Sequence, residues 1–193
     1  MKYITPYLET ERLILKRGTF DDYVKVYEYD FCYLRNIGDE FKYVKYDSNK
    51  LHSFVTYADE TEYAMDFIVF LKDDNIPIGN IVIDRFNKEL NSLEIACNLH
   101  PTYWRKGYMS EAIKEVMQYI FLNLNIDNII YGYAEDNYKS KGLSDKLGFD
   151  FYQEYITHYK RIDKDVKEIE TIMSKDKFMK LYNISTKGVI GMC

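Results

Sequence analysis

The feature that most constrains the fold is a change in the spacing of apolar residues near position 107. Before it, apolar segments at residues 66–72, 76–85 and 92–99 are joined by short polar turns, a pattern typical of an antiparallel strand meander. After it, apolar residues recur every three or four positions from Met109 to Leu124, which predicts an amphipathic helix of about five turns. Strands followed by a long one-faced helix predict a mixed α/β sheet.

Weaker local signals extend this pattern toward both ends of the chain. Thr19 and Asn137 are suited to cap helices, and Gly148 suits the left-handed position that follows a helix. The remaining expected elements are a strand at 12–16, a helix from 20 to about 30, one or two short helices within 31–62, a strand at 128–134, a short helix ending at 147, and strands at 149–159 and 168–174 before a polar tail.

The composition is that of an ordinary globular protein. Hydrophobic residues make up 47% of the 193 residues and charged residues 30%, and no repeat or Pro/Gly/Ser-rich linker divides the chain. We therefore expect one domain over residues 1–193, with a core at about 9–180 and a C-terminal tail at about 181–193.

Composition also limits the classes of partner and site that we expect. No apolar run approaches the ~20 residues of a membrane span, and the first residues lack the apolar region of a signal peptide, so we expect a cytoplasmic protein with no membrane partner. The net charge of −5 and the lack of a long basic block argue against a nucleic-acid partner. Three widely spaced cysteines indicate neither a disulfide framework nor a zinc site.

The segment that carries chemistry is PTYWRKGYMSEA at residues 101–112, between an expected strand and the long helix. The first turn of a helix has backbone N–H groups without partners, at the positive end of the helix dipole, and this geometry favours a pyrophosphate. Gly107 allows close backbone approach because it has no Cβ, and Arg105 and Lys106 add positive charge. Taken alone, the segment also fits an ordinary helix start with a solvated basic turn.

Four ordered segments resemble the GNAT acetyltransferase superfamily, in particular its Rim-type branch of ribosomal-protein N-terminal acetyltransferases and relatives. They are TERLIL at 10–15, IGNI at 78–81, YWRKGYMSEA at 103–112, and NYKS at 137–140 followed by KLGF at 146–149. The third resembles the coenzyme A loop usually written YWGKGYATEA. Arg105 replaces a common glycine of that loop, and Met109 stands where the wider superfamily has Gly or Ala. The resemblance covers about residues 9–180.

The resemblance implies a mixed, mostly antiparallel central sheet with two splayed parallel strands, at 92–99 and 128–134, and flanking helices. Acetyl-CoA would lie between these strands and pass its acetyl group directly to a primary amine, without a metal. A backbone N–H near Leu99 would stabilise the oxyanion. The expected coenzyme A-binding residues are Leu99, Trp104, Arg105, Lys106, Gly107, Tyr108, Met109, Ser110, Asn137 and Ser140.

Two catalytic residues are suggested by the same resemblance. Glu94 is the candidate base, because other superfamily members place a carboxylate on this strand; an exposed strand residue is the alternative, and a carboxylate from 31–62 is another candidate base. Ser140 is the candidate acid for the leaving thiolate, because the tyrosine common four positions later is Ser144 here. A serine bonded to backbone in a first helical turn is the alternative. The lone histidine near the loop, His100, is expected to be structural.

The acceptor is expected to be an amine-bearing molecule, and we favour a protein N-terminal α-amine. A small polyamine or aminoglycoside is the alternative, to be distinguished by an acidic pocket. A protein that binds acetyl-CoA without turnover is a second alternative. Binding of another nucleotide is disfavoured because the chain has no Walker or dinucleotide fingerprint. A homodimer is left open.

Overall fold

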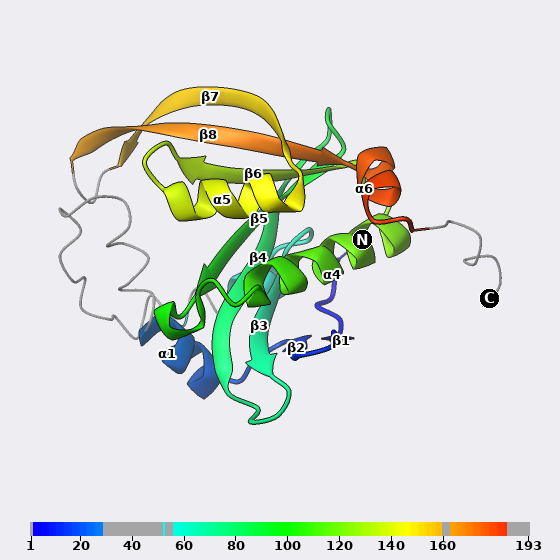
Figure 1. Cartoon of the computed structure of the whole chain (residues 1–193), viewed down its shortest axis with the longest axis vertical. Coiled ribbons are helices and arrows are strands. Elements are labelled where there is room, and N and C mark those ends of the chain that lie inside the picture. The colour runs from blue at the N-terminus through cyan, green and yellow to red at the C-terminus, as the bar shows by residue number, and fades with distance from the viewer. Residues whose placement is uncertain (1, 29–51, 53–55, 160–162, 185–193) are drawn as a thin grey trace.

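A computed structural model describes residues 2–28, 52, 56–159 and 163–184, and an eight-stranded sheet runs through it (Figure 1). The strand order is β1-β2-β3-β4-β5-β6-β8-β7, and every neighbouring pair is antiparallel except β5 with β6. This topology confirms the predicted α/β fold with a mostly antiparallel sheet. The strands are β1 (Leu8–Glu9), β2 (Leu13–Lys16), β3 (Met65–Leu71), β4 (Pro77–Asn87), β5 (Ser92–Leu99), β6 (Asn128–Ala134), β7 (Asp150–Tyr159) and β8 (Lys164–Ser174).

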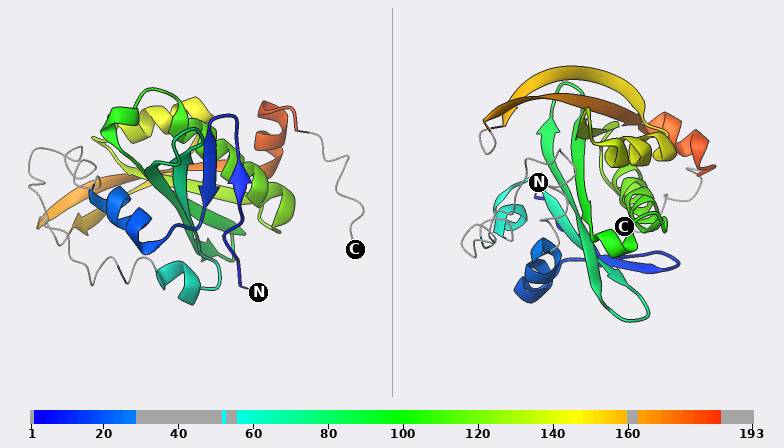
Figure 2. Two further views of the ribbon diagram at one scale, coloured as in Figure 1. Left: turned by 90° about the horizontal axis from the view of Figure 1, so that it is seen from below. Right: turned by 60° about the vertical axis from the view of Figure 1, so that its left-hand side comes forward.

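Helices cover both faces of the sheet. Figure 2 shows α4 and α5 on one face and α1 on the other. Their bounds, with a short 3-10 turn, are α1 (Phe20–Glu28), η1 (Pro101–Tyr103), α4 (Tyr108–Asn123), α5 (Tyr138–Leu147) and α6 (Lys175–Leu181). No helix in the described part of the chain is long and apolar enough to cross a membrane.

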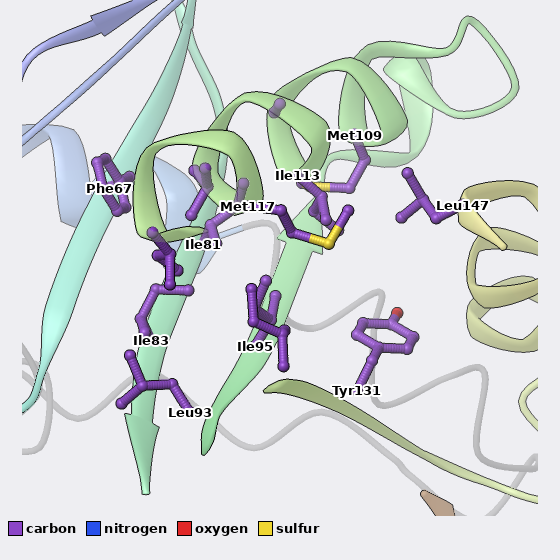
Figure 3. Close-up of a cluster of buried hydrophobic side chains, with 14 of the residues drawn as sticks. Phe67, Ile81, Ile83, Leu93, Ile95, Met109, Ile113, Met117, Tyr131 and Leu147 are labelled. Carbon is purple, nitrogen blue, oxygen red and sulfur yellow. The ribbon is translucent and has the colours of Figure 1, made fainter. Parts of the chain in front are cut away.

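The main core lies between α4 and the sheet. The apolar stripe predicted for the long helix is buried as expected, and Met109, Ile113 and Met117 point toward the strands (Figure 3). On the facing strands, Ile81 and Ile95 are at most 1% exposed. Burial of this stripe fixes α4 on the sheet, because each fully buried apolar side chain contributes roughly 1.5–3 kcal/mol. The first turn of α4 is thereby held beside the end of β5.

The C-terminal region differs from the sequence-based prediction. Strand β8 begins at Lys164 rather than at 168, and residues 175–181, expected to open a polar tail, form α6. Ser174 caps this helix by accepting a hydrogen bond from the Lys177 N–H, and Phe178 is fully buried. A helix of seven residues is only about two turns long, so its apolar residues give almost no periodic signal in the sequence. Within the expected 31–62 helical region, residues 56–60 are helical, and 29–51 and 53–55 lie outside the described residues.

The two parallel strands separate part-way along their length. Their pairing runs from Ser92↔Asn128 to Ile95↔Tyr131, although β5 continues to Leu99. Backbone N–H groups along a strand alternate between its two neighbours. Since His100 donates to the Ile78 carbonyl on β4, the N–H groups of residues 97 and 99 face the gap instead. The fold therefore leaves an unpaired strand edge open to a ligand.

Candidate functional site

A cavity of about 470 Å³ lies where β5 and β6 separate, between the first turns of α4 and α5. It brings together most of the residues predicted to bind coenzyme A. The predicted residues that line it are Leu99, Trp104, Arg105, Gly107, Tyr108, Met109, Ser110, Asn137 and Ser140. Two predicted site residues, Lys106 and Glu94, are not among the lining residues.

The start of α4 has the geometry of an anion site. Gly107 is its N-cap residue with φ 83°, Arg105 also has a positive φ of 59°, and among the described residues no side chain caps the helix. A Cβ built on Gly107 would lie 3.4 Å from Nη2 of Arg12 and 3.7 Å from Nζ of Lys146. Unpartnered N–H groups at a helix start, with Lys146 on the same cavity wall, fit a pyrophosphate well. Arg12 and Lys146 both lie in segments that resemble the GNAT superfamily, but no local pattern indicates a role for either of them.

The first turn of α5 forms the facing wall. Asn137 is 2% exposed and caps this helix, its Oδ1 accepting a 3.1 Å hydrogen bond from the Ser140 N–H, as the sequence predicted. The Nζ of Lys139 lies 3.7 Å from the centre of the Trp104 ring, which joins α5 to the loop after β5. Ser140 is thus held at the cavity wall, with its hydroxyl on a turn fixed by Asn137.

Cys97 and Tyr131 also line the cavity. The Cys97 sulfur lies 3.7 Å from the Tyr131 hydroxyl. Burial raises the pKa of the Cys97 thiol to about 11, although the contact with Tyr131 acts in the opposite direction. A thiol that stays protonated is a poor nucleophile, so the site lacks the features of a cysteine acyl-enzyme mechanism.

Ser144 stands at the position where many superfamily members have a tyrosine, and its contacts are those of a residue with a structural role. Its hydroxyl lies 2.9 Å from the Thr171 hydroxyl, and Thr171 donates to the Tyr131 carbonyl at 2.9 Å. Ser144 is 1% exposed and does not line the cavity. Its hydrogen bond therefore joins α5 to β8 rather than reaching a ligand.

Glu94 lies on the sheet face opposite α4. Strand alternation places it on the other side from Leu93 and Ile95, and both of its carboxylate oxygens accept from Nη1 of Arg85, at 3.0 and 2.9 Å. Burial raises the pKa of Glu94 above its ordinary value, while Arg85 acts to lower it. Arg85 itself has a φ of 51°, at an irregularity in β4 that turns its side chain toward Glu94.

The sheet face opposite α4 also carries a second carboxylate. A Cβ built on Gly132 would lie 3.8 Å from Oε1 of Glu94 and 3.8 Å from Cγ of Glu170 on β8. Glu170 accepts hydrogen bonds from Gln153 at 2.7 Å and from Tyr155 at 3.0 Å. The missing side chain at Gly132 thus leaves space between two carboxylates, on the other side of the sheet from the cavity.

His100 has the structural role that was expected. Its Nδ1 accepts a 3.3 Å hydrogen bond from the Thr102 N–H and caps the η1 turn, and burial lowers its pKa. No group of three or more potential metal ligands occurs in the part of the chain that the structure describes.

The family follows from comparison with known proteins. Residues 12–150 match the family model described as the acetyltransferase (GNAT) domain. The chain belongs to the GNAT family. The match spans the segment at 103–112 that resembles a coenzyme A loop, hereafter the cofactor loop, together with the separating strands and α5. This GNAT protein is therefore an acetyl-CoA-dependent N-acetyltransferase, with acetyl-CoA as its cosubstrate.

Individual relatives agree with this assignment. The chain is 29% identical over 145 residues to an uncharacterized N-acetyltransferase, YnaD, of Bacillus subtilis, covering 74% of this chain and 81% of that protein. The ribosomal-protein-S5-alanine acetyltransferase of Vibrio fischeri superposes with a TM-score of 0.69 at 20% identity, over 90% and 98% of the two chains. Spermidine N-acetyltransferase from Vibrio cholerae, solved with CoA and spermine, superposes with a TM-score of 0.73 at 17% identity, over 88% and 99%. At these identities the two structures support the fold alone.

Proposed function

We propose that this GNAT protein transfers the acetyl group of acetyl-CoA to a primary amine that approaches Gly132 from the face opposite α4. The observation that carries the proposal is the end of β5–β6 pairing at Ile95↔Tyr131, which opens the sheet between the cavity and the carboxylates of the other face. A thioester in the cavity and an amine on the far face could meet in this opening. Direct attack needs no enzyme nucleophile, in keeping with the protonated Cys97 thiol.

Binding of the donor is assigned to the cofactor loop. The backbone N–H groups of residues 105–110 would hold the pyrophosphate, with Asn137 bracing the opposite wall. The pantetheine arm would pair with the free edge of β5 like an added strand. Its carbonyl oxygen would then lie near the N–H groups of residues 97 and 99, so the backbone near Leu99 remains the proposed oxyanion donor.

Proton transfer is assigned to two side chains. Glu94, whose pKa is raised toward neutral pH by burial, would take the proton from the amine, directly or through a water molecule. The Ser140 hydroxyl on the cavity wall would donate the proton that the leaving thiolate needs. The carbon–sulfur bond breaks as the carbon–nitrogen bond forms, and the products are an N-acetylated amine and free coenzyme A.

We propose a protein N-terminal α-amine as the acceptor, and the Rim-type branch as the position of the chain in its family. An α-amine has a pKa near 7.7–8.0 and a lysine amine near 10.4, so far more of the α-amine is neutral at pH 7. Because Arg85 engages both oxygens of Glu94, the proposed base is a weak one and suits the less basic amine. The fold is also shared with a ribosomal-protein acetyltransferase.

A small polyamine is the second candidate, and a specific observation favours it. Glu94 and Glu170 flank Gly132, with Asp84 next to Arg85 on the same face, so the approach to the opening is acidic. An acidic pocket is the feature expected to distinguish polyamine acceptors from peptides. Spermidine N-acetyltransferase shares the fold.

A competition experiment tests the proposal. The protein is incubated with acetyl-CoA and equal concentrations of a basic N-terminal peptide, spermidine and an aminoglycoside, with free thiol and product masses measured over time. The proposed function predicts thiol release that depends on an amine, with the peptide acetylated first. Exclusive acetylation of spermidine would favour the second candidate. Thiol release that no amine accelerates would contradict both.

A further inference from the structure

The cofactor loop is held from behind by a segment far away in sequence. Arg12, just before β2, donates from Nε to Oε2 of Glu111 at 2.7 Å, and its Nη2 lies 2.6 Å from the same oxygen. Its Nη1 donates to the Lys106 carbonyl at 3.0 Å. The guanidinium also lies over the Tyr108 ring, 4.4 Å from its centre. One side chain thus joins the N-terminal strands to the loop and to the first turn of α4.

Glu111 completes the same cluster with its other oxygen. Oε1 accepts from the Thr10 hydroxyl at 2.5 Å and from the Arg12 backbone N–H at 3.0 Å. Partial burial would raise the pKa of Glu111, but these hydrogen bonds and the Arg12 charge together hold it below its ordinary value. Glu111 is therefore ionised at neutral pH, and the cluster keeps its charge pair.

The contact with the Lys106 carbonyl decides how the loop presents its N–H groups. In a trans peptide unit the C=O and the following N–H point in opposite directions. Arg12 does not line the cavity, whereas Gly107 does, so a Lys106 carbonyl drawn toward Arg12 turns the Gly107 N–H away from Arg12 and toward the ligand. The positive φ of Arg105, the residue before Lys106, is a conformation that needs such support.

We infer that Arg12 and Glu111 are positioning residues for the cofactor loop, which couple the N-terminal strands to the binding of the coenzyme A pyrophosphate. The inference rests on the proposed role of the loop. The pair adds little to folding stability, because the Arg12 side chain is 41% exposed and such ion pairs contribute weakly. The pair instead affects the affinity for coenzyme A, because it sets the direction of the loop N–H groups. Binding of coenzyme A should in turn stabilise the Arg12–Glu111 contact, because such coupling is reciprocal.

Substitution of Arg12 and a truncated donor test the inference together. Arg12→Met removes the charge at similar length, and Arg12→Lys keeps the charge but lacks the planar fork that reaches both acceptors. We expect Arg12→Met to raise the Kd of acetyl-CoA about tenfold, with kcat at saturating donor near wild type, and Arg12→Lys to have a smaller effect. With S-acetyl-pantetheine, which lacks the pyrophosphate, kcat/KM is expected to stay at the wild-type value.

A second ion pair of the same strands supplies the matched control. Lys72 Nζ lies 2.7 Å from Oε1 of Glu9, which ties β1 to the turn after β3 with no contact to the loop among the described residues. Glu9→Gln should leave the Kd of acetyl-CoA and the kcat/KM for S-acetyl-pantetheine unchanged. Glu111→Gln should raise the Kd of acetyl-CoA as much as Arg12→Met does. The double variant should bind acetyl-CoA no more weakly than either single variant, because all three disrupt the same Arg12–Glu111 contact.

Three results would overturn the inference. One is an unchanged Kd for acetyl-CoA in Arg12→Met. Another is an equal loss with both donors, which would make Arg12 a general structural residue. The third is an equal loss in Glu9→Gln. A wild-type protein that failed to bind acetyl-CoA would instead remove the proposed role of the loop, and the inference with it.

As a direct readout of the coupling, acetyl-CoA should slow hydrogen exchange of the Arg12 backbone N–H, which donates to Glu111.

Discussion

The indole N–H of Trp104 donates a 2.7 Å hydrogen bond to the carbonyl oxygen of Leu99. This carbonyl faces the gap between β5 and β6, where a pantetheine arm would otherwise compete for it. The indole therefore occupies one acceptor of the free strand edge and leaves the N–H groups of residues 97 and 99 for the ligand. It also fixes the loop that follows β5 to the last residue of that strand.

Trp104→Phe should loosen this connection. The variant keeps an aromatic ring beside Lys139 but loses the hydrogen bond to Leu99, at a cost of about 1 kcal/mol, or a Tm lower by roughly 2–4 °C. We also expect weaker acetyl-CoA binding, measured by calorimetry. The control is Lys139→Met, which removes the cation over the ring and leaves the indole hydrogen bond. If Lys139→Met lowered Tm as much as Trp104→Phe, the hydrogen bond would not be the stabilising contact.

Gly107 should be the position at which cofactor binding is most sensitive to charge. Acetyl-CoA at about 100 times its Kd should stabilise the wild-type protein by ~2.7 kcal/mol. Gly107→Asp should abolish this gain, because it adds a carboxylate at the residue whose N–H is proposed to bind the pyrophosphate, and the two anions would repel each other. Gly107→Asn is the matched control, since Asn tolerates the left-handed conformation and has no charge. Equal binding by the Asn and Asp variants would contradict an anion site here.

The parts of the fold set by local pattern were predicted well from the sequence. The bounds of β5 and β6 are those predicted, and Gly148 has the expected positive φ of 83° after α5. These elements have strong hydrophobic patterning and clear turn residues at their ends. The eleven-residue strand β8 was predicted too short, because three of its first four residues are charged and this part of the strand is defined by pairing with β7.

The contacts between distant segments were not predictable from one sequence. Arg12 and Glu111 are 99 residues apart in the sequence. Each lies in a segment that resembles the family, but nothing in either segment predicts that the two side chains meet. The same holds for Lys146, which the fold brings beside Gly107. Glu94 was placed on the correct strand, but its engagement by Arg85 depends on an irregularity in β4 that no periodic pattern contains.

The pH dependence of turnover should report on Glu94. A base must be deprotonated, so kcat/KM should fall as the pH drops through the pKa of Glu94, which burial raises above its ordinary value. Arg85 opposes that rise, and Arg85→Met should therefore raise the pKa further and move the acid limb to higher pH. Lys177→Met, which removes the partner of Asp150 away from this face, is the control. A limb that stayed in place in Arg85→Met would belong to the acceptor amine or to another group.

Ser140→Ala should lower turnover and leave acetyl-CoA binding almost unchanged. The Ser140 backbone N–H would still donate to Asn137, so the start of α5 should keep its cap, and only the hydroxyl on the cavity wall is lost. General acid catalysis typically contributes ~10²–10⁴-fold, which sets the expected fall in kcat. Ser144→Ala provides the comparison. It removes a hydroxyl from the same helix, but that hydroxyl bonds to Thr171 and does not line the cavity. That variant should lose about 1–3 kcal/mol of stability, measured by chemical unfolding, with kcat retained. Wild-type turnover in Ser140→Ala would reduce Ser140 to a residue of the helix start, and a large rise in the Kd of acetyl-CoA would make it a binding residue instead.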